Sequence, residues 1–258
     1  MIEAIQPELA RDGAPAREGF PSQEIARSMR GTETLARVPL FASLAPGDVR
    51  ALDSRCVWRR VTAGEWVVDS SSNGTDVYFV LHGHLRGVVL SSGRETILGD
   101  VRDGGHFGAV AAIDGQPGVC GLRAVADTVV ARMNAAVFRD VIHRYPSVCD
   151  GVLAVFAQTT RMLVNRANEQ AHLHVRERLC AELLRLSRAG AKGRIVISPP
   201  PTHAELAARI STRREAVTRL LKALELEGAI ARTRGAIALT DPDHLRRIIA
   251  EREQHRAA

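Results

Sequence analysis

Five polar residues near the C-terminal end of the chain have types and spacing that suit contact with a nucleic acid. They are Arg214, Glu215, Thr218, Arg219 and Lys222. At helical periodicity these residues share one face of a helix. A guanidinium group can bind guanine through two hydrogen bonds, and a carboxylate can accept a hydrogen bond from the amino group of cytosine. A merely solvated helix face can have the same composition, so the interpretation depends on the elements that position these residues.

The segment 202–228 predicts two short helices joined by a tight turn. Thr202 precedes Glu205 by three residues, and Thr212 precedes Glu215 by three, which is the spacing of two capping boxes. The inner face of the two helices is predicted to contain Ala204, Leu206, Ala207, Ile210, Val217, Leu220, Leu221 and Leu224. A helix-turn-helix presents its second helix to the DNA major groove in this way.

Residues 229–239 predict two short strands around the turn Thr233-Arg234-Gly235. Such a hairpin would be a wing next to the helix-turn-helix, with Arg232 and Arg234 placed to contact phosphates. A net charge of +6 is compatible with a polyanionic partner.

The composition is typical of a globular protein with two domains. The chain has 258 residues, of which 45% are hydrophobic and 25% charged. It contains no apolar run of membrane-spanning length and no signal-peptide pattern, so we expect a cytoplasmic protein without membrane contact. The four cysteines (56, 120, 149 and 180) form no CxxC motif. We therefore expect reduced thiols, no metal site and no cofactor.

Glycine-punctuated short strands predict an all-β roll or barrel from Val38 to about Arg132. This roll is the main part of a predicted domain at 34–145, which follows an N-terminal arm at 1–33. The arm is predicted to be mobile or to form a short helix at 25–29. Pro46 is expected at the start of a helix, and Ser91-Ser92-Gly93 and Ser72-Asn73-Gly74 are expected hairpin turns. The expected strands are 57–61, 65–69, 77–81, 85–90, 96–99, 122–125 and 128–133.

A helix is predicted at 135–144, and a longer one from Ser147 toward His172, with apolar residues at steps of three and four as in a coiled-coil seam. One row of side chains would pack on the β domain and the other on a second copy of the chain; burial within its own domain is the alternative. The predicted dimer interface contains Val152, Val155, Phe156, Thr159, Thr160, Met162, Leu163, Arg166 and Ala167. The hinge is expected near Leu173-His174, which gives a helix-and-hinge segment at 146–174 and a DNA-binding domain at 175–258.

The residues of 35–245 resemble the cyclic-AMP receptor protein and fumarate–nitrate regulator (Crp/Fnr) superfamily of bacterial transcription factors. The resemblance is carried by LFASL, GEWVV, VYFVLHGHLRGVV, SGRETIL, GGHFGAV, VRERLCAELL and AELAARISTRREAVTRLLKALELEGAI. It implies an α+β fold: an N-terminal β-roll of the cyclic-nucleotide-binding, jelly-roll type, a long dimerisation helix, and a C-terminal winged helix-turn-helix. It also implies a homodimer on double-stranded DNA, with RNA polymerase as a further partner.

The resemblance assigns roles to individual residues of the second helix. Arg214 and Arg219 match the arginines that read guanines in the family, and Glu215 matches the glutamate that accepts from base amino groups. Thr218 stands where one branch of the family has Gly and another has Ser. The resemblance therefore implies either a TGTGA-like or a TTG-type half-site and does not decide between them. Arg213 replaces a common Ser and is expected to contact phosphate; Thr202 is also placed in the DNA interface.

The predicted sensor departs from the cyclic-AMP-binding pattern at every polar contact. After Phe107-Gly108 the ribose-binding Glu is replaced by Ala109, and the phosphate-binding Arg and its neighbour are replaced by Gly118 and Val119. Leu163 and Val164 stand where the long helix usually offers hydroxyl groups. Because a buried phosphate without its Arg is costly, we expect a degenerate effector pocket that has another ligand or none.

Other sensor chemistries receive little support from the sequence. The arm lacks the cysteine cluster of the oxygen-sensing branch, and His82 and His84, expected on one face of a strand, are more simply hydrogen-bonded or solvated than metal-bound. Cys120 and Cys149 have no activating neighbours in the sequence, and His172 and His174 flank the hinge, where protonation could affect a switch.

No nucleophile–base set, P-loop or Rossmann fingerprint is present, so we predict no enzyme activity. A sensor module that binds a cyclic nucleotide without DNA is the alternative function.

Overall fold

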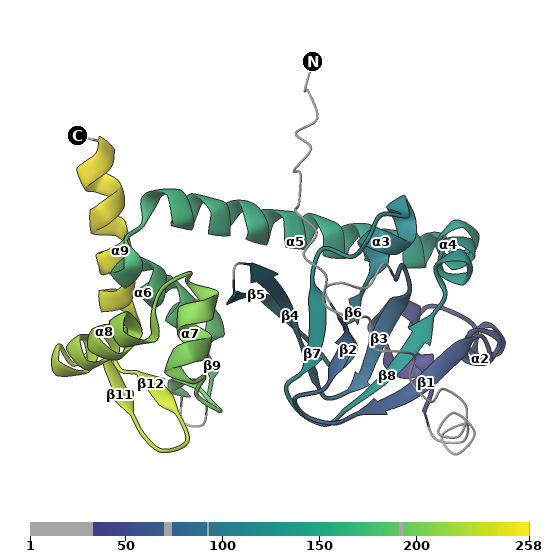
Figure 1. The fold of residues 1–258 in the computed structure, drawn as a ribbon, viewed down its shortest axis with the longest axis horizontal. Helices are drawn as coiled ribbons and strands as arrows, with labels where there is room; N and C mark the ends of the chain where they lie inside the picture. The colour runs from purple at the N-terminus through teal and green to yellow at the C-terminus, as the bar shows by residue number, and fades with distance from the viewer. Residues whose placement is uncertain (1–32, 70–73, 92, 191–192, 258) are drawn as a thin grey trace.

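The chain forms an α+β structure in which one long helix connects two groups of strands (Figure 1). This computed structural model describes residues 33–69, 74–91, 93–190 and 193–257. The predicted N-terminal arm, except its last residue, lies outside the described residues, as do Ser92 of one predicted turn and Ser72 and Asn73 of the other. Among the helices of the described ranges, none is long and apolar enough to cross a membrane.

The N-terminal half contains two four-stranded antiparallel sheets. One sheet has the order β1-β8-β3-β6 and the other β2-β7-β4-β5. The strands are β1 (Cys56–Val61), β2 (Trp66–Val68), β3 (Val77–His82), β4 (His84–Ser91), β5 (Arg94–Arg102), β6 (His106–Phe107), β7 (Gly121–Ala124) and β8 (Thr128–Met133). All seven predicted strands are present. The two-residue strand β6 was not predicted, because it is too short to show a periodic pattern.

Strand β3 is buried on both faces and joins two parts of the core. Val80 faces the apolar cluster between the two sheets, with residues such as Leu85 and Leu122. Phe79 faces the other way and packs against Phe41 and Phe138 of the surrounding helices, with ring centroids 5.1 and 6.4 Å away. These short elements are η1 (Leu35–Arg37), η2 (Pro39–Phe41), α2 (Pro46–Asp53), α3 (Ala109–Asp114) and α4 (Ala135–Arg144). Pro46 lies in the first turn of α2, as predicted.

Helix α5 (Pro146–His172) runs from α4 to the C-terminal domain (Figure 1). Its first turns pack against the sensor core through Val148, Val152 and Phe156. Further along the helix, Arg166 donates hydrogen bonds to the backbone carbonyls of Ile97 and Leu98 in β5. Val152 and Phe156 were predicted in the dimer interface, but they pack against their own domain. These two residues follow Val148 at steps of four, so they lie on the side of the helix that faces its own domain, and Val152 is buried there.

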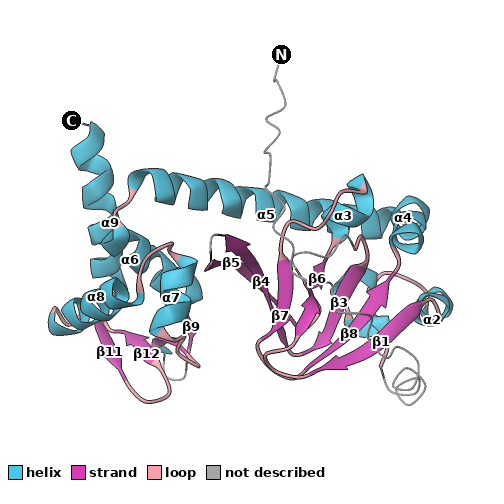
Figure 2. Cartoon of the chain, viewed as in Figure 1, coloured by secondary structure: helices cyan, strands magenta, loops and turns pink. Residues whose placement is uncertain are grey.

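The C-terminal domain follows a break in the helix at Leu173-His174, where the hinge was predicted. It contains the four helices α6 to α9 and a small sheet of order β11-β12-β10-β9 (Figure 2). The elements are α6 (Val175–Leu186), β9 (Arg188–Ala189), β10 (Ile195–Ile197), α7 (His203–Arg209), α8 (Arg214–Leu226), β11 (Ile230–Arg232), β12 (Ile237–Leu239) and α9 (Pro242–Ala257). One apolar cluster unites α6, α7, α8, α9 and the sheet, and Leu245 and Ile248 are its buried residues from α9.

The two histidines expected on one strand lie on two. His82 ends β3 and His84 begins β4, with a turn at Gly83 between them. Gly83 has φ +111°, and a Cβ atom there would lie 2.4 Å from Thr128 Oγ1, so the turn requires glycine. The sequence did not predict this turn, because the short apolar-polar alternation around 82–84 is also typical of a continuous strand. The positive φ of Gly83, which reverses the chain, does not change that alternation.

Candidate nucleic-acid interface

The first helix of the predicted helix-turn-helix, α7, begins with a complete capping box. Thr202 Oγ1 accepts a hydrogen bond from the Glu205 amide at 3.2 Å, and Glu205 Oε2 accepts one from the Thr202 amide at 2.7 Å. Two backbone donors that the helix leaves free are thereby satisfied. Leu206 and Ile210 are buried as predicted, whereas Ala204 is exposed.

The turn between the helices differs from the prediction at the second capping box. Ser211 has φ +53°, and the Thr212 amide donates to the Ala207 carbonyl at 3.0 Å, so Thr212 still belongs to the turn. Arg213 is extended and is the N-cap of α8, without a side-chain cap. The Thr212–Glu215 box is therefore wrong, because α8 starts one residue later than that box requires.

Helix α8 separates an apolar face from a charged one. Val217, Leu221 and Leu224 are fully buried against the other helices. The predicted DNA-contacting residues of this helix and its cap are all exposed: Arg213, Arg214, Glu215, Thr218, Arg219 and Lys222. Within the described residues, Arg214, Arg219 and Lys222 have no ion-pair partner, so their charges are available to an external anion.

A shallow groove lies beside the first turn of α8 and includes a residue that the sequence analysis missed. It is lined by Arg94, Ser211, Thr212, Arg213, Glu215, Ala216 and Arg219. Arg94 comes from the start of β5, next to the predicted hairpin turn at Gly93, which has φ +72°. Its position 119 residues before Arg213 gave no local signal of this proximity.

His203 is a second residue without an earlier assignment. Its Nδ1 lies 2.7 Å from Thr218 Oγ1, and that hydroxyl donates to the Arg214 carbonyl at 3.0 Å. The first residue of α7 is therefore linked to the exposed face of α8. Partial burial, together with the charges of Arg232 and Arg214, lowers the pKa of His203 from its ordinary value of 6.5.

The predicted wing is present as the β11–β12 hairpin, but its two arginines have different surroundings. The Arg232 guanidinium pairs with Glu225 at 2.7 Å, and this hydrogen bond lowers the pKa of the Glu225 carboxyl. Arg234 is exposed at the tip. An ion pair within the chain offsets part of the charge that Arg232 could offer to a phosphate, whereas Arg234 keeps its charge for a partner.

The residues of the predicted effector pocket lie in chain segments of contrasting exposure. Phe107 ends β6, Gly108 has φ +93°, and Ala109 is buried at the start of α3. Val119 is 67% exposed, and Gly118 lies in the loop before it. Each of these positions has an apolar side chain or none, so the segment offers no charged side chain there to a phosphate.

The two α5 residues assigned to the same pocket are exposed, and Leu163 faces the junction between the domains. It lines a cavity of about 200 Å³ with Ile97 and Leu98 of β5 and with Arg166. Val164 is 54% exposed. The remaining predicted interface residues of α5, Val155, Thr159, Thr160, Met162 and Ala167, are exposed or half-exposed in the single chain.

The thiols and histidines that the structure describes lie in separate parts of the chain. Among the described residues, no group of three or more His, Cys, Asp and Glu side chains could hold a metal ion. The four cysteines are free, and burial raises the pKa of the Cys120 thiol. A raised pKa disfavours the thiolate and thereby reduces the reactivity of Cys120 toward oxidants.

Comparison with known protein families matches both halves of the chain. Residues 58–145 match the cyclic nucleotide-binding domain, and residues 177–248 match the Crp-like helix-turn-helix domain. The chain is 28% identical over 204 residues to the cyclic AMP receptor protein of Thermus thermophilus, covering 79% of this chain and 93% of that protein. A solved transcriptional regulator of the CRP/FNR family, also from Thermus thermophilus, is similar with a TM-score of 0.58 and 25% identity, over 76% of this chain and 99% of that one.

A second group of relatives shares only a segment with this chain. The mouse patatin-like phospholipase domain-containing protein 6 is 29% identical over 136 residues, which is 52% of this chain and 10% of that protein. The chain thus spans about a tenth of the length of these relatives.

Proposed function

Because this chain belongs to the Crp/Fnr superfamily of bacterial transcription regulators, we propose that it binds double-stranded DNA through the exposed face of α8. Its family is one of regulators and not of enzymes. The carrying observation is the set of exposed arginines on the first turns of α8, without ion-pair partners in the described chain. Arg214, Glu215 and Arg219 would contact base edges in the major groove, and Thr218 would contribute with them.

Contacts to the DNA backbone would surround these base contacts. Arg213, Lys222 and Arg234 are exposed cations on the same domain, and Thr202 and Arg232 are exposed there as well. Phosphate contacts fix the orientation of the protein on the duplex and make affinity depend on salt. A TGTGA-like or TTG-type half-site is the sequence that this set of residues would read.

The proposal includes a homodimer in the cytoplasm that reads two half-sites. Leu153, Val155, Leu163 and Val164 give α5 an exposed apolar surface in the single chain, and a surface of this kind supports pairing with a second α5. Two recognition helices would then meet half-sites about 34–36 Å apart. Replacing Val155 with Glu should convert the dimer to a monomer in sedimentation equilibrium; an unchanged mass would contradict this interface.

The functional division that we propose has four parts: an arm at 1–33, a sensor at 34–145, a dimerisation helix with its hinge at 146–174, and a DNA-binding domain at 175–258. The sensor would not bind cyclic AMP in the usual way, because Ala109, Gly118 and Val119 supply neither carboxylate nor guanidinium. A different effector, or none, would then control the protein, and the family relation extends the proposed partners to RNA polymerase.

Selection from a randomised duplex library by the purified full chain tests this function. At two salt concentrations and without added ligand, we expect enrichment of a palindrome whose half-sites contain guanines. Binding without enrichment of any sequence would contradict the proposed base contacts, and binding of a cyclic nucleotide without any DNA affinity would favour a sensor module instead.

A further inference from the structure

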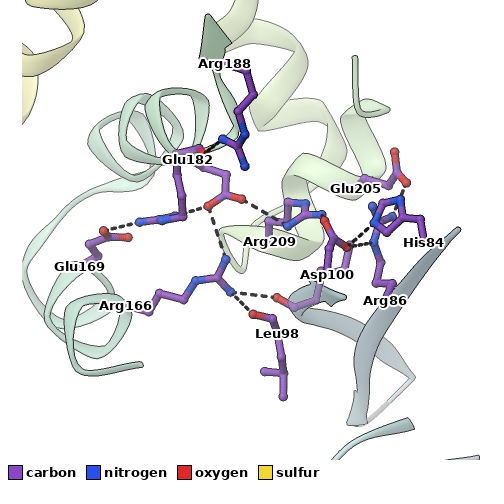
Figure 3. A network of polar contacts seen from close by, with 12 residues as sticks. His84, Arg86, Leu98, Asp100, Arg166, Glu169, Glu182, Arg188, Glu205 and Arg209 are labelled. Atoms are coloured by element: carbon purple, nitrogen blue, oxygen red, sulfur yellow. Dashed lines mark hydrogen bonds and ion pairs between the residues drawn. The ribbon is translucent and has the colours of Figure 1, made fainter. Parts of the chain in front are cut away.

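A buried group of ion pairs joins the sensor sheet to the helix-turn-helix (Figure 3). It contains four guanidinium groups and four carboxylates from β4, β5, α5, α6 and α7. We call it the junction network: Arg86, Asp100, Arg166, Glu169, Glu182, Arg185, Glu205 and Arg209. Because four positive and four negative charges are balanced within the group, the junction network is electrically neutral without a ligand.

Both ends of helix α7 are attached to one pair of strands. Arg86 of β4 donates to Glu205 in the first turn of α7, and Asp100 of β5 accepts from Arg209 in the last turn. Arg86 and Asp100 face each other across the β4–β5 ladder, and Arg86 Nε donates to Asp100 Oδ1 at 2.8 Å. A single cross-strand pair of the sensor therefore fixes the direction of α7.

Three of the four side chains of this attachment are shielded from water, whereas Glu205 is 31% exposed. The side chains of Arg209, Arg86 and Asp100 are 4, 8 and 14% exposed. Burial alone would raise the pKa of Asp100, but hydrogen bonds with His84 and Arg86 and the charge of Arg209 hold it well below its ordinary value of 3.8. Buried charges of this kind require accurate geometry to be compensated, which disfavours small rotations of α7 against the sheet.

The attachment reaches the DNA-contacting face through two short steps. Glu205 uses Oε1 for Arg86 and Oε2 for the Thr202 amide, so the same carboxylate caps α7 and binds the sensor. Helix α7 then packs on α8 through the shared cluster that includes Leu206 and Val217. The arginines of α8 remain exposed while the network is closed, so the network does not block the DNA-contacting face.

We propose that Arg86 and Asp100 are positioning residues for DNA recognition: they set the orientation of the recognition helices that a palindromic site requires. The inference rests on the proposed function. In a dimer, the second half-site is bound at high effective concentration only if the second recognition helix is already in place. A mobile helix-turn-helix loses that advantage, whereas its contacts with one half-site are unchanged.

The test compares Arg86→Met with a matched control, Arg123→Met, in the full chain. Arg123 is the cross-strand neighbour of Arg86 on β7, but its ion pair with Glu95 stays within the sensor. Affinities are measured for the selected palindrome and for a duplex with one half-site. We expect Arg86→Met to weaken palindrome binding about tenfold, which is about 1.4 kcal/mol, with half-site binding changed less than about twofold. Arg123→Met should change neither.

A second variant removes the same ion pair from the other side, so that the test does not depend on the folding of Arg86→Met alone. Glu205→Gln keeps a residue that can serve in a capping box but removes the charge that pairs with Arg86. It should reproduce the loss on the palindrome, and the double variant should lose little more than either single one, because both remove one interaction.

Three outcomes would overturn the inference. The first is an affinity of Arg86→Met for the palindrome that equals the wild-type value. The second is a higher affinity, which would mean that the network inhibits DNA binding. The third is an equal loss of affinity for the palindrome and the half-site, which would mean that Arg86 has a purely structural role. If the wild-type chain itself does not distinguish the palindrome from a scrambled duplex, the proposed function fails first.

Discussion

The molecule has two arginine-rich clusters, and they have opposite surroundings. On α8, Arg214 and Arg219 are exposed, without ion-pair partners among the described residues. In the junction network, Arg86 and Arg209 are buried and paired with carboxylates. Since buried charges persist only when compensated, the second cluster is stable without a partner, whereas the first can gain most of its interactions from a polyanion. Residue type alone therefore does not identify a binding surface; burial and pairing do.

The largest effect on stability is expected at the centre of the buried cluster. Glu182 is 1% exposed and lies within ion-pair distance of Arg166, Arg185 and Arg209. Replacing it with Gln should leave these cations undercompensated and lower the free energy of unfolding by about 3–5 kcal/mol. Chemical denaturation measures this. Glu95→Gln removes a more exposed pair with Arg123 and should cost about 0.2–1 kcal/mol; equal losses would show that burial does not distinguish the two pairs.

The buried cluster should also have a defined pH dependence. The pKa of Asp100 is lowered in the folded state. The ionised carboxylate therefore contributes fully to the free energy of unfolding above the unfolded-state pKa of 3.8, and this contribution is lost as pH falls below that value. Asp100→Asn should therefore destabilise the chain by about 2–3 kcal/mol at pH 6, and the difference from wild type should narrow toward pH 3. Denaturation at several pH values checks this, and a difference that widens on acidification would contradict the assignment.

The exposed cluster should affect DNA binding and leave stability unchanged. Arg219→Ala should cost about 1–3 kcal/mol of binding to the selected site and relax the preference at one base position. Lys222→Ala is the matched comparison. Loss of a phosphate contact should weaken binding to all sequences alike and reduce the slope of log affinity against log salt concentration by about one. Both are measured by titration of labelled duplexes. Identical base preferences for Arg219→Ala and wild type would exclude the proposed base contact.

The smallest effect on stability is expected at Thr202 and Thr212, the two threonines that precede α7 and α8. Thr202→Ala removes an observed cap and should cost about 1 kcal/mol of stability. Thr212 does not cap α8, so Thr212→Ala should leave the thermal unfolding temperature within error. A larger loss at Thr212 than at Thr202 would reverse this assignment of caps.

Local patterns predicted the helix-turn-helix well, because its signals lie within a few residues of one another. The Thr202–Glu205 spacing, the apolar face of α8 and the wing hairpin are all properties of short segments. The predicted base-contacting residues also lie on the exposed face, since their spacing fixes which side of the helix they occupy. The second capping box failed because the positive φ of Ser211 extends the turn.

The junction network could not be predicted in this way. Arg86 and Glu205 are 119 residues apart, and the segment VYFVLHGHLRGVV contains nothing that distinguishes Arg86 from a solvated arginine on a strand. The same applies to Arg94 beside the recognition helix. Contacts between domains depend on how two finished domains pack together, and no periodicity in one segment specifies the partner in another.

The most direct test of the central claim is the affinity of the full chain for its selected palindrome and for the same duplex with both half-sites scrambled, at one fixed salt concentration. A readout by the exposed face of α8 predicts binding to the palindrome that is at least about 10³-fold tighter. Equal affinity for the two duplexes would mean that the exposed arginines contact only phosphates, and it would contradict the account.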